Sequence, residues 1–175
     1  YNLSGSTFTW LSYRFQNPWT YDFVKDRGEP GREGVLVWLW HPKGVTPRSR
    51  TELVPSRHFP VKGNMVMRSG WEHDANYLCF DAGPLGAAHI HQDKLNIVIW
   101  AAGRELLFDG GGGSYERSPW RAYGTGAASH NVIMVDGKPQ ARGPDERMSE
   151  KPIDARWEST AEHDFAAGVY ESGFG

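Results

Sequence analysis

The stretch DKLNIVIWAAGRELLFDGG, residues 93–111, holds two short apolar runs joined through AAGRE. Short apolar runs that flank a turn containing glycine predict a β-hairpin. Further runs of similar length occur before and after this hairpin, each ending in turn residues: HFPVKGNMVMRSGW (58–71), ANYLCFDAG (75–83), HNVIMVDGKPQ (130–140) and DARWESTAEHDFAAGVYES (154–172). The 130–140 run is predicted to be a strand closed by an Asp136-Gly137 turn, and the 154–172 run to be two strands.

Short strands at even spacing, without a long helix between them, favour a mainly β fold, an antiparallel sandwich or barrel. Before this region, residues 7–28 predict one or two short helices, residues 34–45 a short strand or helix end, and residues 46–56 a polar linker.

Bulk properties exclude several classes of function. The chain has 175 residues and a formal net charge of −2, which gives no electrostatic basis for binding nucleic acid. It lacks the run of about 18 apolar residues that membrane insertion requires. Cys79 is the sole cysteine, so no internal disulfide forms. The chain starts at Tyr1 and stops inside a predicted strand, so we expect a piece of a longer polypeptide.

Three histidines and an aspartate suggest a metal site. On a strand, His89 and His91 would share one face, because residues two apart point the same way. If the hairpin forms, Asp109 returns towards His91, and His130 begins another run. Two histidines and a carboxylate suit zinc, with Asp93 or Asn131 as an orienting partner. Ordinary hydrogen-bonded structural histidines remain the alternative.

Two segments resemble the heparinase II/III-like family of polysaccharide lyases. They are FDAGPLGAAHIHQDKLNIVIWAAGRELLFDGGGGSY (80–115) and WRAYGTGAASHNVIMVDGKPQ (120–140). They match, in order, the family's Asp-x-Gly-Pro, His-Gly-His-x-Asp, Leu-Leu-x-Asp, Ala-His-Asn-Thr and Val-Asp-Gly motifs. The chain departs at Ile90, where the family has glycine, and at Val132, where it has threonine.

This resemblance implies a helical (α/α) toroid followed by an antiparallel β-sandwich. Residues 1–50 would be the end of the toroid and its linker, and residues 51–175 the sandwich, incomplete at its C-terminus. The implied activity is β-elimination of an acidic, uronate-containing polysaccharide. The upstream toroid would be the partner domain and would supply the main acid and base, so we expect the piece alone to be inactive. The location implied is periplasmic or secreted.

The resemblance also implies roles for individual residues. His91, Asp109 and His130 would bind a structural zinc ion, His89 would assist catalysis, and Tyr115 would lie at the cleft. The neighbouring sequence YERSPWRAY (115–123) offers Arg117 and Arg121 as carboxylate or sulfate ligands and Trp120 as a stacking platform. A solvated loop with one anchoring tryptophan is the plainer interpretation of that sequence.

Two other functions are left open by the sequence. A cupin-like oxygenase or isomerase also uses His-x-His on a β-fold, but it adds a Glu soon afterwards, and here none follows before Glu105. A non-catalytic carbohydrate-binding β-domain would bind sugar through its aromatic residues without needing His89.

Overall fold

A computed structural model describes residues 5–20, 39, 44–46, 48–83, 90–112, 115–140, 155–171 and 173–175. The chain separates into two compact units, Tyr1–Val54 and Pro55–Gly175. In the part of the chain that the structure describes, no helix has the length and apolar character needed to cross a membrane.

In the first unit, the described residues 5–20 are mainly helical, which agrees with the prediction for that part of the chain. Helix α1 spans Gly5–Phe15 and ends where Gln16 adopts a positive φ of 51°. The side chain of Asn17 then accepts hydrogen bonds from the backbone amides of Trp19 and Thr20, which starts a new helical turn. The predicted linker holds one short 3-10 helix, η2 (Arg50–Glu52), capped by Ser49. Most of residues 34–45, predicted as a strand or helix end, lie outside the described residues.

The second unit is built on a five-stranded antiparallel sheet with strand order β1-β2-β3-β4-β5. Its strands are β1 (Arg57–Phe59), β2 (Asn64–Arg68), β3 (Tyr77–Asp81), β4 (Asn96–Ala101) and β5 (Arg104–Leu107). The turn between β4 and β5 places Ala102 and Gly103 at φ values of 52° and 71°. Positive φ at both central residues matches the twist of the flanking strands, which confirms the predicted hairpin.

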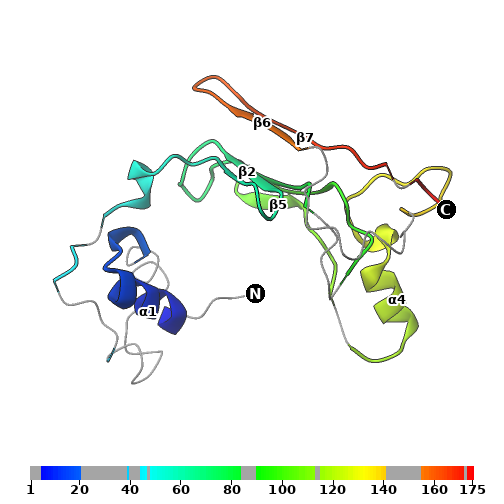
Figure 1. Ribbon diagram of the computed structural model, residues 1–175, viewed down its shortest axis with the longest axis horizontal. Helices are drawn as coiled ribbons and strands as arrows, with labels where there is room; N and C mark the ends of the chain where they lie inside the picture. The colour runs from blue at the N-terminus through cyan, green and yellow to red at the C-terminus, as the bar shows by residue number, and fades with distance from the viewer. Residues whose placement is uncertain are drawn as a thin grey trace. The chain divides into compact units, whose positions relative to one another are not determined.

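A two-stranded ribbon covers one face of this sheet. Strands β6 (Arg156–Ser159) and β7 (Asp164–Ala167) pair antiparallel, and Figure 1 shows them beside the five-stranded sheet. The ring centroid of His58 on β1 lies 6.1 Å from that of Trp157 on β6. Met65, on the same face as His58, is fully buried. The predicted mainly β, antiparallel sandwich arrangement is confirmed, because two sheet layers enclose apolar side chains.

Two local features differ from the sequence prediction. The run from His130 to Val135 forms no strand, although Asp136 and Gly137 make the predicted turn and Val135 bridges to Lys138. In this run, Asn131 contacts β4 through its side chain, which donates to the carbonyl of Ile97, and through its backbone carbonyl, which accepts from the amide of Ile97 at 3.4 Å. Helix α4 (Pro119–Thr125) was not predicted; it begins where the side chain of Ser118 accepts from the amide of Arg121 and proline occupies the first turn.

Candidate metal centre

Three side chains with metal-binding atoms converge at one end of the sheet. One ligand atom from each of His91, Asp93 and His130 lies within 4.8 Å of the others. The rings of His91 and His130 have centroids 5.2 Å apart and are tilted by 33°. His130 is buried, whereas His91 and Asp93 are half-buried.

His130 is oriented by a carboxylate. Its Nδ1 lies 2.9 Å from both carboxylate oxygens of Asp109. A neutral imidazole that donates its Nδ1 proton to Asp109 presents the lone pair of Nε2 on the opposite side of the ring. This Nε2 is buried and has no hydrogen-bond partner among the described residues. A buried acceptor without a partner is costly, and an ion at this position would satisfy it.

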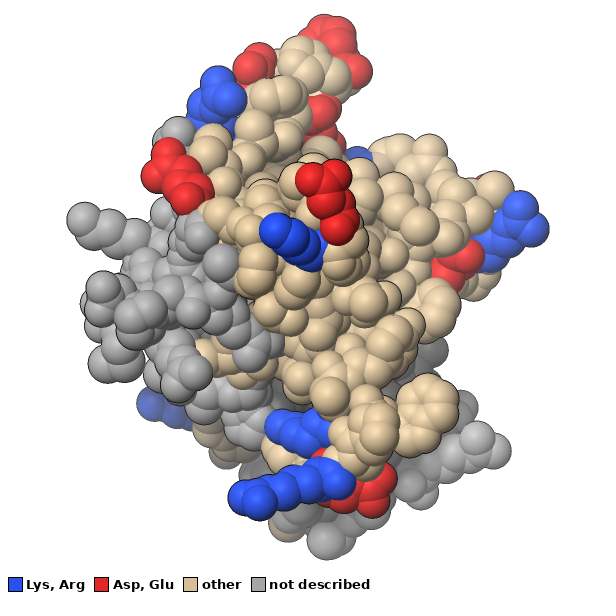
Figure 2. Space-filling view, turned by 90° about the vertical axis from the view of Figure 1, so that its right-hand side faces the viewer, with Lys and Arg blue, Asp and Glu red and all other residues tan. Residues whose placement is uncertain are grey.

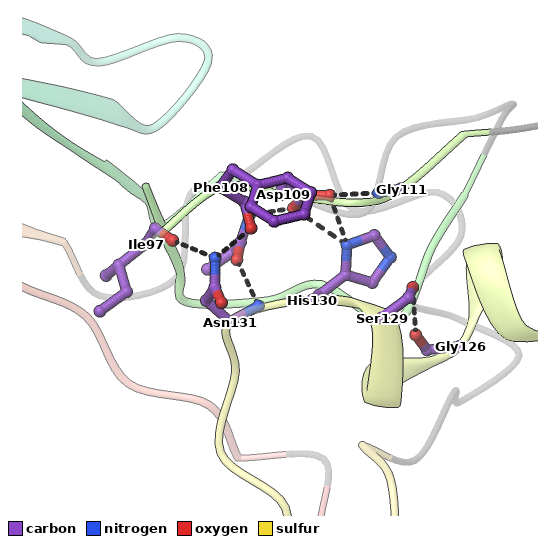
Figure 3. Close-up of polar contacts among 9 residues, drawn as sticks. Ile97, Phe108, Asp109, Gly111, Gly126, Ser129, His130 and Asn131 are labelled. Atoms are coloured by element: carbon purple, nitrogen blue, oxygen red, sulfur yellow. Dashed lines mark hydrogen bonds and ion pairs between the residues drawn. The ribbon is translucent and has the colours of Figure 1, made fainter. Parts of the chain in front are cut away.

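Asp109 is itself held by two donors, of which Gly111 is labelled in Figure 3. The amide of Gly111 donates to Oδ1 at 2.7 Å, and the side chain of Asn96 donates to Oδ2. Gly111 also passes very close to the pair, because a Cβ there would lie 2.5 Å from Cε1 of His130 and 2.7 Å from Oδ1 of Asp109. Only glycine fits this approach without displacing the imidazole.

Asn131 fixes the segment that carries His130. Its amide donates to Oδ1 of Asn96, and its side-chain nitrogen donates to the carbonyls of Ile97 and Phe108, each at 2.9 Å. Both hydrogen bonds of the side chain are visible in Figure 3. Asn131 thereby joins β4 to the end of the β4-β5 hairpin. The imidazole and its carboxylate are consequently anchored to the same piece of sheet.

The donor set fits zinc. Two imidazole nitrogens and one carboxylate oxygen are ligands that zinc accepts, and three protein ligands leave a fourth position for water or another donor. The carboxylate behind His130 is the arrangement that commonly fixes the tautomer of a ligating histidine. The residues of this chain are therefore suited to the cofactor that the sequence predicts.

The structure brings most of the sequence-predicted ligands together but favours an exchange of roles. Asp109 was predicted to bind the metal and Asp93 to orient a histidine. In the structure Asp93 joins the two histidines, whereas Asp109 contacts the far nitrogen of His130. The catalytic candidate His89 lies outside the described residues. Sequence reasoning missed Asn96 and Gly111, although the glycine run after Asp109 was a visible signal for a close backbone approach.

The predicted carbohydrate-binding residues lie on and just before α4. Trp120 is 79% exposed and Tyr115 is 70% exposed. The guanidinium of Arg121 lies 4.8 Å from the centre of the Tyr115 ring, and Arg117 is exposed. The end of α4 is tied to the metal centre, because the amide of Gln92 donates to the carbonyl of Thr125 at 2.9 Å. Helix α4, which carries Trp120 and Arg121, is thus hydrogen-bonded to Gln92, the residue that follows His91.

Charged side chains are scattered on the face of the molecule shown in Figure 2. Lysine and arginine alternate with acidic residues there, and wide uncharged areas separate them. On this face, recognition of an anionic ligand would depend on individual arginines rather than on a broad basic surface.

Comparison with known proteins places the chain in a family. The model of the family "Heparinase II/III-like, C-terminal" matches residues 51–173, the greater part of the chain. A search of the curated proteins finds no match.

Similar solved structures show the fold. A heparan sulfate lyase, HepC from Pedobacter heparinus, is 16% identical with a TM-score of 0.63, and the match covers 89% of this chain and 21% of that chain. A structure titled Heparinase III-BT4657 gene product is 24% identical with a TM-score of 0.54 over 78% of this chain and 19% of that one. The chain therefore spans about a fifth of the length of these structures. On the family match, the chain belongs to the heparinase II/III-like family and contains its C-terminal domain.

Proposed function

We propose that this chain is part of a polysaccharide lyase that cleaves a uronate-containing acidic polysaccharide by β-elimination. The observation that carries the proposal is the family match over residues 51–173, which contain the His91, Asp93 and His130 cluster. The names of similar solved structures, heparinase III and heparan sulfate lyase, agree with this class of substrate. The proposed location is the periplasm or the cell exterior, where such polymers are found.

A zinc ion held by His91, Asp93 and His130 has a structural role in this proposal. When bound, it cross-links the loop before β4 to the segment that follows η3 (Ala127–Ser129). Asp109 holds His130 in the tautomer that can bind the ion. The ion therefore stiffens one wall of the substrate cleft, and His89, two residues before a ligand, would be presented from that wall.

The exposed residues near α4 would bind and orient the substrate. β-Elimination requires removal of the proton next to the uronate carboxylate and stabilisation of the charge that then develops on that carboxylate. Arg117 and Arg121 supply cations for this purpose, and Trp120 offers a flat face to a sugar ring. The hydroxyl of Tyr115, with Arg121 over its ring, supplies a proton-transferring group at the same place.

The remaining acid and base belong, in this proposal, to a helical toroid upstream in the same polypeptide. The chain supplies one wall and the toroid the other, so the 175-residue chain alone is expected to show little turnover. The natural full-length protein is the appropriate enzyme for an assay. A purely carbohydrate-binding role would need the same exposed Trp120 but no proton transfer at Tyr115, which gives a means of separating the two functions.

The test is product formation by the full-length protein on heparan sulfate, alginate and a neutral dextran. β-Elimination leaves a carbon–carbon double bond conjugated to the carboxylate, which absorbs ultraviolet light. We expect absorbance to rise with an acidic polymer only, and Tyr115→Phe to reduce the rate. Tyr123→Phe, on the nearby helix α4 and also exposed, is the matched control. New reducing ends without ultraviolet absorbance would show hydrolysis and contradict the proposal.

A further inference from the structure

The loop that carries His91 and Asp93 is not part of a strand and must be held by other means. The backbone of this loop forms hydrogen bonds with several separate segments. The amide of Leu95, for example, donates to the carbonyl of Asp81 at 2.9 Å. Leu95 also adopts a positive φ of 60°. A branched residue rarely adopts this conformation, so the surrounding contacts must over-determine it.

Gln140 forms hydrogen bonds with the residues on both sides of Asp93. Its side-chain oxygen accepts from the amide of Lys94 at 2.9 Å, and its side-chain nitrogen donates to the carbonyl of Lys94 at 2.6 Å. In return, the side chain of Gln92 donates to the backbone carbonyl of Gln140 at 2.8 Å. The side-chain amide of Gln140 thus takes the place of a neighbouring strand for Lys94, and the backbone carbonyl of Gln140 accepts from Gln92, so the residues on both sides of Asp93 are attached to Gln140.

Burial makes these bonds consequential. Gln140 is 3% exposed and Lys94 is 5% exposed. Removing the side-chain amide would leave the amide and the carbonyl of Lys94 without this partner inside the protein, where solvent cannot replace it. The backbone of Gln140 is held independently by a β-bridge to Phe174, which fixes the position from which its side chain bonds to Lys94.

We propose that Gln140 is a positioning residue that holds His91 and Asp93 in ligand geometry before the ion binds. This inference rests on the metal centre of the proposed function. Gln140 does not touch the ion. It acts through Gln92 and Lys94, which flank Asp93, and it lowers the cost of ordering the loop when metal arrives. Nothing in the sequence pattern of the metal ligands points to this glutamine, which lies 47 residues after Asp93 in the printed sequence.

The test compares Gln140→Met, a similarly long apolar side chain, with the unchanged chain. Two quantities are measured: hydrogen exchange at the Lys94 amide without metal, and the zinc dissociation constant by competition with a chromophoric chelator. We expect exchange to be roughly tenfold faster. We expect zinc binding to weaken roughly 10- to 100-fold, the usual effect of losing an orienting partner. If Gln140→Met does not fold, Gln92→Met removes a single bond and should change both quantities in the same direction.

The matched control is Ser56→Ala. Ser56 is also a buried polar residue, 7% exposed, and it bonds to Arg68 and Asp164 rather than to the metal loop. It should lower stability without changing Lys94 exchange or zinc affinity. Normal zinc affinity in Gln140→Met would overturn the role of Gln140 and leave the metal centre standing. Failure of the unchanged chain to bind zinc would overturn the metal centre, and the role of Gln140 with it.

Discussion

Nδ1 of His130 lies 2.9 Å from both carboxylate oxygens of Asp109, and the opposite nitrogen of the ring is buried without a hydrogen-bond partner among the described residues. This contact determines which nitrogen of His130 is available to bind a metal ion. If Nδ1 donates to the carboxylate, Nε2 carries the lone pair, and a ring nitrogen of His130 lies within 4.8 Å of ligand atoms of His91 and Asp93.

Removing the two carboxylates should have unequal effects. Asp93→Asn replaces a proposed ligand, whereas Asp109→Asn keeps the ligands and weakens only the orienting bond. We therefore expect Asp109→Asn to weaken zinc binding roughly 10- to 100-fold and Asp93→Asn to weaken it further. Dissociation constants from chelator competition would check this. The reverse order would restore Asp109 as the ligand and Asp93 as the orienting group.

Adjacent glycines should respond differently to a methyl group. At Gly111 a Cβ would lie 2.5 Å from the His130 ring, whereas at Gly110 the nearest atom would be 3.6 Å away. Gly111→Ala should therefore destabilise the fold by about 1–3 kcal/mol and weaken zinc binding, because the imidazole must move. Gly110→Ala should have little effect. Urea unfolding of both variants measures the difference, and equal stabilities would show that the close approach is absent.

The sheet should lose stability at alkaline pH through Tyr77. Burial raises the pKa of Tyr77 to about 12, with further contributions from Cys79, whose own pKa is also raised by burial. An unfolded tyrosine loses its proton near pH 10, so between about pH 10 and 12 the unfolded chain releases a proton that the folded chain retains. The free energy of unfolding should therefore fall as pH rises through this range.

Tyr77→Phe isolates this contribution. Phenylalanine cannot titrate, so the decline in the free energy of unfolding between pH 9 and about pH 11 should be shallower than in the unchanged chain. Tyr123→Phe, at an exposed position, serves as the control. Parallel pH profiles for Tyr77→Phe and the unchanged chain would contradict the assignment.

The surface around α4 should contribute binding energy rather than stability. Trp120 is 79% exposed, so Trp120→Ala should leave the melting temperature nearly unchanged. It should weaken binding to a uronate oligosaccharide by about 1 kcal/mol or more, because a stacking platform is lost. Arg121→Gln should weaken binding in a salt-dependent way, with the exposed Arg104→Gln on β5 as its control. Calorimetric titration with unchanged affinity in both variants would remove this surface from the site.

The parts of the fold that could be predicted are those set by local pattern. The apolar run between Asn96 and Ala101 and the glycine at position 103 are sufficient to predict the β4-β5 hairpin. Convergence of His91 and His130 was expected from strand ends meeting at one sheet edge, but both histidines lie on segments outside the strands. Helix α4 was missed because seven residues carry too little periodicity, although Ser118 and Pro119 are recognisable start signals.

The proposed exchange of roles between Asp93 and Asp109 could not be predicted from the sequence pattern. Both aspartates lie near the histidines, and the rotation of the imidazole decides which of them faces Nδ1 of His130. That rotation depends on Asn96, which holds Asp109, and on Asn131, which fixes the backbone beside His130. These contacts join residues 13 and 35 positions apart, so their geometry depends on the assembled sheet.

The zinc content of the purified chain tests the metal centre most directly. After refolding with zinc and extensive dialysis, elemental analysis should find about one ion per chain, and chelation should lower the melting temperature. His91→Ala and His130→Ala should each lose the ion, whereas His163→Ala, on the exposed turn between β6 and β7, should retain it. An unchanged chain without zinc, or equal loss in all three variants, would contradict the assignment.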